Sequence, residues 1–177
     1  MGNPIVFTQL KPSIWQYKLA RALRKKGQKT VLVSILNKFD KEEYKKAFSE
    51  IISLDLDSLK AKTIFSRFLH NPSSFFKFFK SLLLIKPKVV ICEGAPHYLA
   101  SIFLMFFKKK CPRIYFPYDM NFTRLPNPGI YFPKRELWGE KYSFTHCDGF
   151  FYKSDKNELD LLPKSFKIKE KPSIGIP

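Results

Sequence analysis

The sequence is poor in glycine, which occurs only 7 times in 177 residues. Glycine-rich loops that hold phosphate groups are therefore scarce. No G-x-x-x-x-G-K-[ST], G-x-G-x-x-G, H-E-x-x-H or G-x-S-x-G pattern occurs. The sequence thus gives no motif support for P-loop nucleotide hydrolysis, dinucleotide binding, zinc-protease chemistry or an α/β-hydrolase nucleophile.

Long hydrophobic runs are also lacking. The longest, Tyr98 to Phe107, ends at the three lysines 108–110 and is shorter than the roughly 20 residues that span a bilayer. It suits a buried helix of an α/β core, and a monotopic membrane contact stays open. No signal peptide is visible, because Met1 to Pro4 lead straight into an apolar strand.

Cysteine is rare, and the three copies are Cys92, Cys111 and Cys147. Their number is odd, and no pair has the close spacing of a metal site. We expect buried thiols in a reducing cytosol, so the predicted location is cytoplasmic, with a peripheral position on the membrane's cytoplasmic face as an option.

Acidic residues are few relative to basic ones, with 15 against 32 and a net charge of +17. Such a charge indicates an anionic partner, for which nucleic acid, anionic lipid and phosphorylated substrates are the candidates. A lysine-rich proteome or an acidic partner domain is the less favoured explanation. The hydrophobic content of 45% and aromatic content of 16% exclude a disordered chain.

Short apolar segments alternate with segments of helical periodicity along the whole chain. The expected strands are 4–8, 29–36, 50–56, 88–92, 113–116 and 150–152, with a last one in the tail 171–177. The expected helices lie between Ser13 and Gly27 and at 41–48, 59–70, 72–86, 95–107, 134–145 and 154–162. This alternation predicts one Rossmann-like α/β domain over residues 1–177, with a doubly wound, mainly parallel sheet and helices on both faces.

Ligands of such sheets bind outside the carboxyl ends of the strands. The loops at these ends are 9–12, 93–97, 117–124 and 153–156. After the fourth strand, Glu93 can orient a ligand hydroxyl, Gly94 permits close approach, and His97 can contact an anion or transfer a proton. An ordinary strand-to-helix turn, with Pro96 near the helix start, is the alternative interpretation.

The loop after the fifth strand carries Tyr118, Asp119 and Asn121. Asp119 can accept hydrogen bonds or act as a base, or it can simply cap the loop. On the helix that follows, Glu136 and Glu140 share a face at i,i+4 spacing. A solvated face with local ion pairs is the favoured interpretation of that pair.

Two further patterns remain open. The D-x-D pattern at 55–57 can hold a metal ion, although three-residue acidic patterns are common by chance. The segment Pro72 to Lys88 mixes phenylalanine with lysine, which suits nucleic acid, an anionic membrane, or a core-facing helix whose lysines reach solvent. We expect core packing to take most of its phenylalanines.

Three segments resemble the N-terminal half of a GT-B glycosyltransferase of the retaining family 4 type. The first, 86–94 (KPKVVICEG), is similar to a "K-P-D-V-V-h-x-H-G" strand; the second, 113–119, is similar to a strand that ends in "H-D"; the third, 147–154, is similar to an "A-D-x-h-h-x-x-S" element. The chain departs from the family by having no glycine pair at 9–12 and by having Tyr118 where a histidine is usual.

The resemblance implies sugar transfer from a nucleotide-sugar donor to a glycan or lipid-linked acceptor, without a metal ion or other cofactor. It implies that the donor sits mainly on a C-terminal half that these residues lack, in the same polypeptide or as a separate subunit. It implies a catalytic role for Asp119 and Tyr118. The substrate-binding residues that it implies are Gln9, Lys11, Glu93, Gly94, His97, Asn121, Arg124, Glu140 and Ser154.

Three kinds of partner follow from these interpretations. The main expected partners are the missing C-terminal half, the nucleotide-sugar donor and the glycan or lipid-linked acceptor. An anionic membrane surface is a further option, and nucleic acid is not expected to bind. Two functional interpretations compete with this one. The first is a basic, flavodoxin-like module that binds polyanions, and the second is the stand-alone half of a split transferase.

Overall fold

The computed structural model describes residues 2–10, 13–35, 40–54, 72–94, 96–108, 111–117, 133–152, 162–166 and 168–175. The chain divides into two compact units, Met1–Lys88 and Val89–Pro177. Each unit has its own strands, helices and buried core. The predicted helices at 59–70 and 154–162 lie wholly or mainly outside the described residues.

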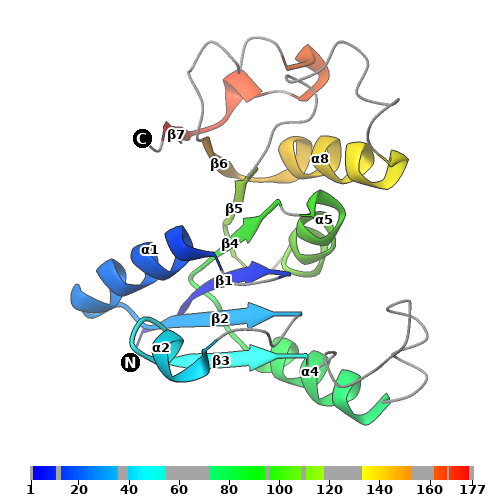
Figure 1. Ribbon diagram of the computed structural model, residues 1–177. Helices are drawn as coiled ribbons and strands as arrows, with labels where there is room; N and C mark the ends of the chain where they lie inside the picture. The colour runs from blue at the N-terminus through cyan, green and yellow to red at the C-terminus, as the bar shows by residue number, and fades with distance from the viewer. Residues whose placement is uncertain are drawn as a thin grey trace. The chain divides into compact units, whose positions relative to one another are not determined.

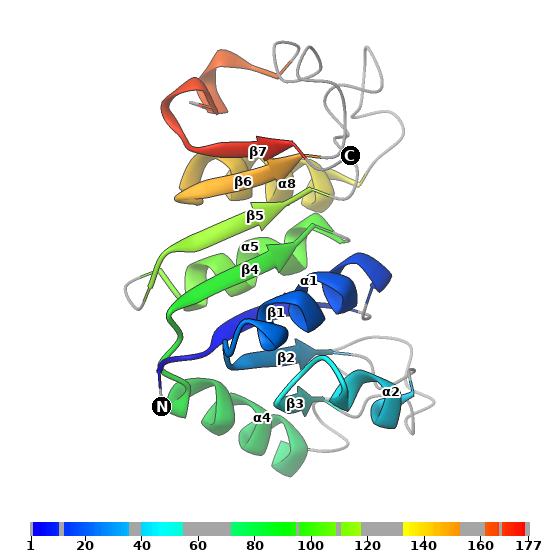
Figure 2. The same cartoon turned by 90° about the vertical axis from the view of Figure 1, so that its left-hand side faces the viewer.

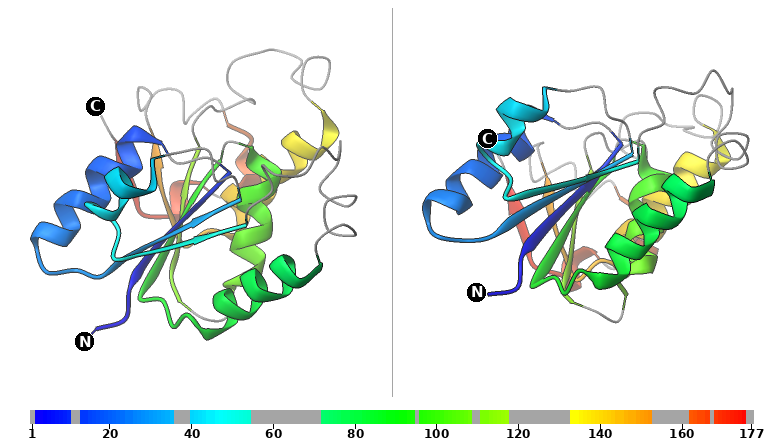
Figure 3. Two further views of the ribbon diagram at one scale, coloured as in Figure 1. Left: turned by 60° about the horizontal axis from the view of Figure 1, so that its bottom comes forward. Right: turned by 90° about the horizontal axis from the view of Figure 1, so that it is seen from below.

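The first unit contains three parallel strands in the order β3-β2-β1 (Figures 1 and 2). They are β1 (Ile5–Gln9), β2 (Thr30–Ser34) and β3 (Glu50–Ser53), and β2 pairs with both of the others. Every residue of β2 is buried, as expected for a central parallel strand with the apolar sequence TVLVS. The helices α1 (Ile14–Lys25) and α2 (Lys41–Lys45) lie on one face of these strands, and α4 (Pro72–Leu84) lies on the other (Figure 3).

The ends of α1 form where the sequence predicts them. Ser13 has the extended backbone of an N-cap residue, with φ −104° and ψ 152°. Gly27 has φ +76°, the left-handed conformation that glycine adopts at helix ends, and its N–H donates to the carbonyl oxygen of Arg24. The chain can therefore leave α1 and enter β2 within a few residues.

The second unit contains four parallel strands in the order β4-β5-β6-β7. They are β4 (Val89–Glu93), β5 (Arg113–Phe116), β6 (Gly149–Tyr152) and β7 (Ser173–Gly175). The helices α5 (His97–Phe106) and α8 (Lys134–His146) lie side by side on one face of β4 to β6 (Figures 1 and 2). Two 3-10 helices, η1 (Lys164–Phe166) and η2 (Ile168–Glu170), were not expected, because three-residue turns carry no periodic signal.

Phenylalanine fills the core of the second unit. The Phe144 ring packs edge-on against Tyr115 and Phe150, with centroids 5.0 and 5.5 Å apart, and stacks on Phe166 at 5.9 Å. All four rings are almost completely buried. The contacts join α8, β5, β6 and η1, so much of the phenylalanine enrichment seen in the sequence serves packing.

The predicted fold class is confirmed. Among the described residues, seven strands occur and every pairing described above is parallel, in a Rossmann-like α/β arrangement. In the second unit the two described α-helices share one face, whereas the first unit has helices on both faces. The expected boundaries are mostly within a few residues of the observed ones, and the strand 113–116 is identical.

An ion pair between the buried Arg113 and the half-exposed Asp148 fixes the start of β5. Asp148 accepts hydrogen bonds from the Arg113 backbone N–H (2.8 Å), from Nε (3.1 Å) and from Nη2 (3.2 Å), and Nη1 donates to the Leu104 carbonyl oxygen. Burial would raise the pKa of Asp148, but the hydrogen bonds from Arg113 and its positive charge lower that pKa below its ordinary value. The carboxylate therefore stabilises the folded state in its charged form.

We expect acid to weaken this unit through Asp148. A carboxyl group whose pKa is lower when folded stabilises the protein above its unfolded pKa of about 3.9, and loses that contribution as the pH falls through the folded value. Asp148→Asn should therefore lower the free energy of unfolding at pH 7 and flatten its dependence on pH below about 5. Urea unfolding at a series of pH values measures both effects, with the exposed Glu170→Gln as control. An unchanged acid profile in Asp148→Asn would contradict the assignment.

Candidate functional site

The carboxyl ends of β4 and β5 are held together by a glycine. Gly94 follows β4 directly, and its N–H donates to the Phe116 carbonyl oxygen at the end of β5 (2.7 Å). Glu93, the last residue of β4, is paired with Phe116 in the sheet and is buried. The predicted pair Glu93 and Gly94 therefore lies at the edge where parallel sheets bind ligands.

His97 contacts two elements beside this edge, the helix α8 and the strand β5. It is the first residue of α5, behind Pro96, and its backbone N–H donates to Glu136 Oε2 on α8 (2.8 Å). Its ring Nδ1 lies 2.5 Å from the hydroxyl of Tyr115 on β5. The Glu136 carboxylate thus satisfies a backbone donor at the N-terminus of α5, where negative charge is favourable, and the Tyr115 hydroxyl orients the imidazole.

Tyr115 keeps its proton at neutral pH. Burial raises the pKa of this phenol well above 10, and the nearby Glu140 carboxylate raises it further. A neutral phenol can donate its hydrogen to His97 Nδ1, which leaves the imidazole proton on Nε2. Tyr115 was not singled out from the sequence, because a tyrosine inside a strand has no pattern that separates it from core.

Gly94 leaves no room for a side chain beside these groups. A Cβ at this position would lie 2.7 Å from His97 Nδ1 and from the Tyr115 hydroxyl, and 2.9 Å from Tyr115 Cε2. Close approach therefore requires glycine here, as the sequence interpretation expected. The histidine, the phenol and the β4–α5 turn form one packed cluster, which we call the α5 cluster: Gly94, His97, Tyr115 and Glu136.

The interpretation of Glu136 and Glu140 as a solvated face is wrong. Glu140 is 0% exposed and Glu136 is half-buried, because this side of α8 packs against α5. Gly139 makes the approach possible, since a Cβ there would lie 2.4 Å from the Tyr98 backbone nitrogen. The i,i+4 spacing correctly placed both carboxylates on one face, but it could not show that this face is inside.

The α5 cluster and its two carboxylate neighbours, Glu93 and Glu140, gather polar side chains that are mostly buried. Imidazole, phenol and carboxylate groups offer both donors and acceptors within one small region. Strong pKa perturbation next to a strand end is a feature of functional sites, although structural networks show it too.

In the first unit, Gln9 ends β1 and is buried with both polar atoms of its amide unpaired. Thr8 beside it and Gln16 on α1 are also buried, and their side-chain polar atoms lack hydrogen-bond partners. Buried amides without partners are costly, so such groups at a strand end are candidates for ligand contacts. The sequence analysis did not identify Gln16 as a candidate site residue. The signal that could have identified it was its place beside Tyr17 on the buried face of α1.

Several predicted site residues lie outside the described residues. They are Lys11, Tyr118, Asp119, Asn121, Arg124 and Ser154, and the D-x-D pattern at 55–57 lies there too. Of the nine predicted substrate-binding residues, the structure brings Gly94 and His97 together in the α5 cluster, with Glu93 and Glu140 next to it. Gln9 lies in the first unit.

Sequence comparison leaves the chain without a close match. No protein-family model matches it, and a search of curated proteins gives no match. Among solved structures, it is similar to a sucrose-phosphate synthase from Thermosynechococcus elongatus, with 12% identity and a TM-score of 0.63. The chain has a GT-B-like fold. The similarity covers 99% of this chain and 48% of the synthase, so the chain spans about half the length of that enzyme.

None of the described helices is both long enough and apolar enough to cross a bilayer. A shared fold does not by itself identify a function, so the chemistry of the site is the guide to function.

Proposed function

We propose that this chain is the acceptor-side domain of a glycosyltransferase that moves a sugar from a nucleotide-sugar donor to a glycan or lipid-linked acceptor. The observation that carries the proposal is the fold similarity to a sucrose-phosphate synthase over 99% of the chain. The family 4-like motifs at 86–94, 113–119 and 147–154 support a retaining enzyme of that type.

The α5 cluster is the proposed acceptor site. His97 and Glu93, at the carboxyl end of β4, bind acceptor hydroxyls, while Tyr115 and Glu136 hold His97 in place. Glu140 acts as a positioning residue, since it is fully buried against the same network. Gln9, the last residue of β1, and Lys11, Asn121, Arg124 and Ser154 are the other proposed substrate-binding residues.

Catalysis in this proposal is electrostatic and needs no metal ion or other cofactor. Asp119 and Tyr118 are the proposed catalytic residues, and fixed dipoles and charges stabilise the positive sugar carbon and the departing diphosphate. The donor nucleotide is held mainly by a second half, which is either further polypeptide or a separate subunit. The 177-residue chain alone is then expected to fold without transferring sugar.

The site variants test this assignment in the polypeptide as it occurs in its source. We expect His97→Gln and Glu136→Gln to reduce acceptor-dependent transfer about 10- to 100-fold, mainly through a higher KM for the acceptor, with the KM for the nucleotide sugar unchanged. Lys141→Gln, an exposed position on the same helix, is the matched control. Thermal midpoints of all variants separate loss of function from loss of fold. Unchanged acceptor kinetics in both site variants would contradict an acceptor site at α5.

A polyanion-binding module is the second candidate, and the net charge of +17 favours it. Such a module would bind RNA or another polyanion with a steep dependence on salt and without preference for nucleotide sugars. We expect nucleic acid binding to be weak, and we propose a cytoplasmic location for the domain.

A further inference from the structure

Helix α4 carries large apolar side chains on its outer side. Phe76, Phe79, Leu83 and Leu84 are 78%, 46%, 63% and 72% exposed, and we call them the α4 stripe. The opposite side of the helix packs inward through Phe75, Phe78 and Leu82. The expectation that core packing takes most of the phenylalanines is therefore wrong for α4, where only two of the four are buried.

The charge around the α4 stripe has one sign. Residues 72–88 include four lysines and no aspartate or glutamate. Lys77 and Lys80 are exposed on the helix between stripe residues, and Lys86 and Lys88 are exposed just after it. Long lysine stems can lie along an apolar surface while the ammonium groups reach outward. An apolar face with basic residues at its sides suits an anionic, apolar surface.

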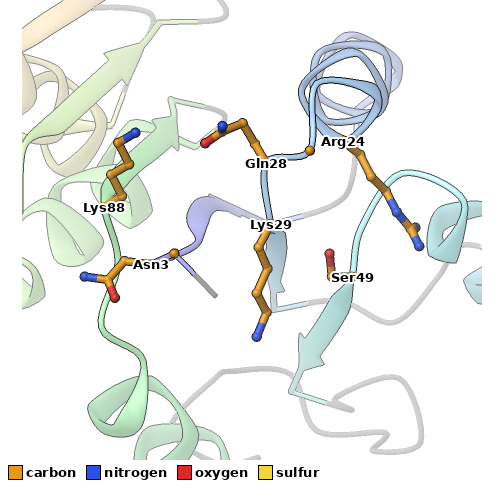
Figure 4. A pocket seen from close by; sticks show the side chains of 8 residues that line it. Asn3, Arg24, Gln28, Lys29, Ser49 and Lys88 are labelled. Carbon is orange, nitrogen blue, oxygen red and sulfur yellow. The ribbon is translucent and has the colours of Figure 1, made fainter.

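A basic hollow adjoins the C-terminal end of the stripe. Leu84 and Lys86 line a cavity of about 350 Å³, together with Lys29 and Asn3. Asn3 and Lys29 also line a second cavity of about 620 Å³, which reaches Arg24 and Lys88 (Figure 4). The two cavities share residues, so we call them together the basic hollow.

The charges of the basic hollow are largely available to a ligand. Among the described residues that line it, the acidic one is Glu50, whose Oε2 lies 3.9 Å from Lys29 Nζ, and both side chains are about half exposed. Arg24 donates from Nη1 to the carbonyl oxygens of Lys45 and Phe48, which holds its guanidinium at the rim. Lysine and arginine at this density can bind the phosphate groups of lipid headgroups.

We propose that the α4 stripe and the basic hollow together dock this domain on an anionic lipid bilayer. The phenylalanine and leucine side chains enter the boundary between headgroups and acyl chains, and the hollow binds headgroup phosphates. A bilayer fits better than an acidic protein because Leu84 belongs to both features, so apolar insertion and phosphate contact meet at one edge. The basic hollow lies at the amino ends of β1 and β2 and the α4 stripe lies along α4, both in the first unit. The proposed acceptor site belongs to the second unit, so docking does not depend on the proposed sugar transfer.

Vesicle sedimentation tests this surface. The wild type should sediment with vesicles of phosphatidylcholine mixed with phosphatidylglycerol and not with phosphatidylcholine alone. Phe76→Ser combined with Phe79→Ser should weaken binding about tenfold or more, and so should Lys77→Glu combined with Lys80→Glu. The matched controls change other exposed sites: Ile102→Ser with Met105→Ser on α5, and Lys18→Glu with Arg21→Glu on α1. The controls should bind like the wild type.

A fluorescence measurement separates insertion from charge attraction. Phe76→Trp should be quenched by lipids with brominated acyl chains, whereas Ile102→Trp should not. Circular dichroism of each variant confirms that it is folded. Absence of wild-type binding to anionic vesicles would overturn the proposal, and a protein partner would then be the better occupant. Equal loss in the α1 control, or stripe variants that bind like the wild type, would also overturn it.

Discussion

Replacing Gly139 by alanine is expected to lower the free energy of unfolding by about 3 kcal/mol, which is at the upper end of overpacking effects. A Cβ at this position would lie 2.4 Å from the Tyr98 nitrogen, 2.5 Å from the Tyr98 Cα and 2.6 Å from the His97 carbonyl carbon. All three are backbone atoms of α5, which cannot rotate away as a side chain can. The two helices must separate, which disturbs packing around Phe144 as well.

The sign of the Gly139 effect is what makes it informative. In an exposed helix interior, alanine is more stable than glycine by about 1 kcal/mol. A stabilised Gly139→Ala protein would therefore contradict the close contact between α5 and α8. Urea unfolding measures the difference, and Lys141→Ala, at an exposed position two residues further along α8, should change stability by less than about 0.5 kcal/mol.

Replacing Gly94 by alanine is expected to reduce sugar transfer about 100-fold, because displacements of roughly 1 Å in a site can have effects of that size. The new methyl group would meet His97 Nδ1 and the Tyr115 hydroxyl, both at 2.7 Å. These are side-chain atoms, so the imidazole and phenol can move and the fold can survive at a cost of about 1–3 kcal/mol. Gly94 therefore separates function from folding better than Gly139 does.

Kinetics and stability must be measured on the same Gly94→Ala sample. Acceptor-dependent transfer gives the activity, and the thermal midpoint shows that the protein is still folded under assay conditions. Gly2→Ala is the control, because nothing lies within 4 Å of a Cβ there. Full activity in a folded Gly94→Ala protein would show that the positions of His97 and Tyr115 do not matter for transfer.

The sequence predicted the order of elements well because local signals mark their ends. Ser13 and Gly27 bound α1, and the apolar runs of β2 and β4 are typical of buried parallel strands. The carboxyl-end rule then led to Glu93, Gly94 and His97, which the structure places around one strand edge. These inferences use only neighbours in sequence and one general property of parallel sheets.

The sequence could not show which elements meet in space. Glu140 is buried because α8 packs on α5, a contact between residues about forty positions apart. Tyr115 belongs to the α5 cluster only because β5 lies next to β4. Similarly, the spacing of phenylalanines on α4 fits a wide apolar face, but only the structure separates the buried Phe75 and Phe78 from the exposed Phe76 and Phe79.

The central claim is that this chain belongs to an enzyme that transfers sugar from a nucleotide. The most direct test is to purify the polypeptide from its source and incubate it with radiolabelled nucleotide sugars and a lipid and glycan extract from the same cells. The account predicts that one donor transfers label to an extractable acceptor, with release of the nucleoside diphosphate. No transfer from any donor, together with salt-sensitive binding to RNA, would contradict the account and favour a polyanion-binding module.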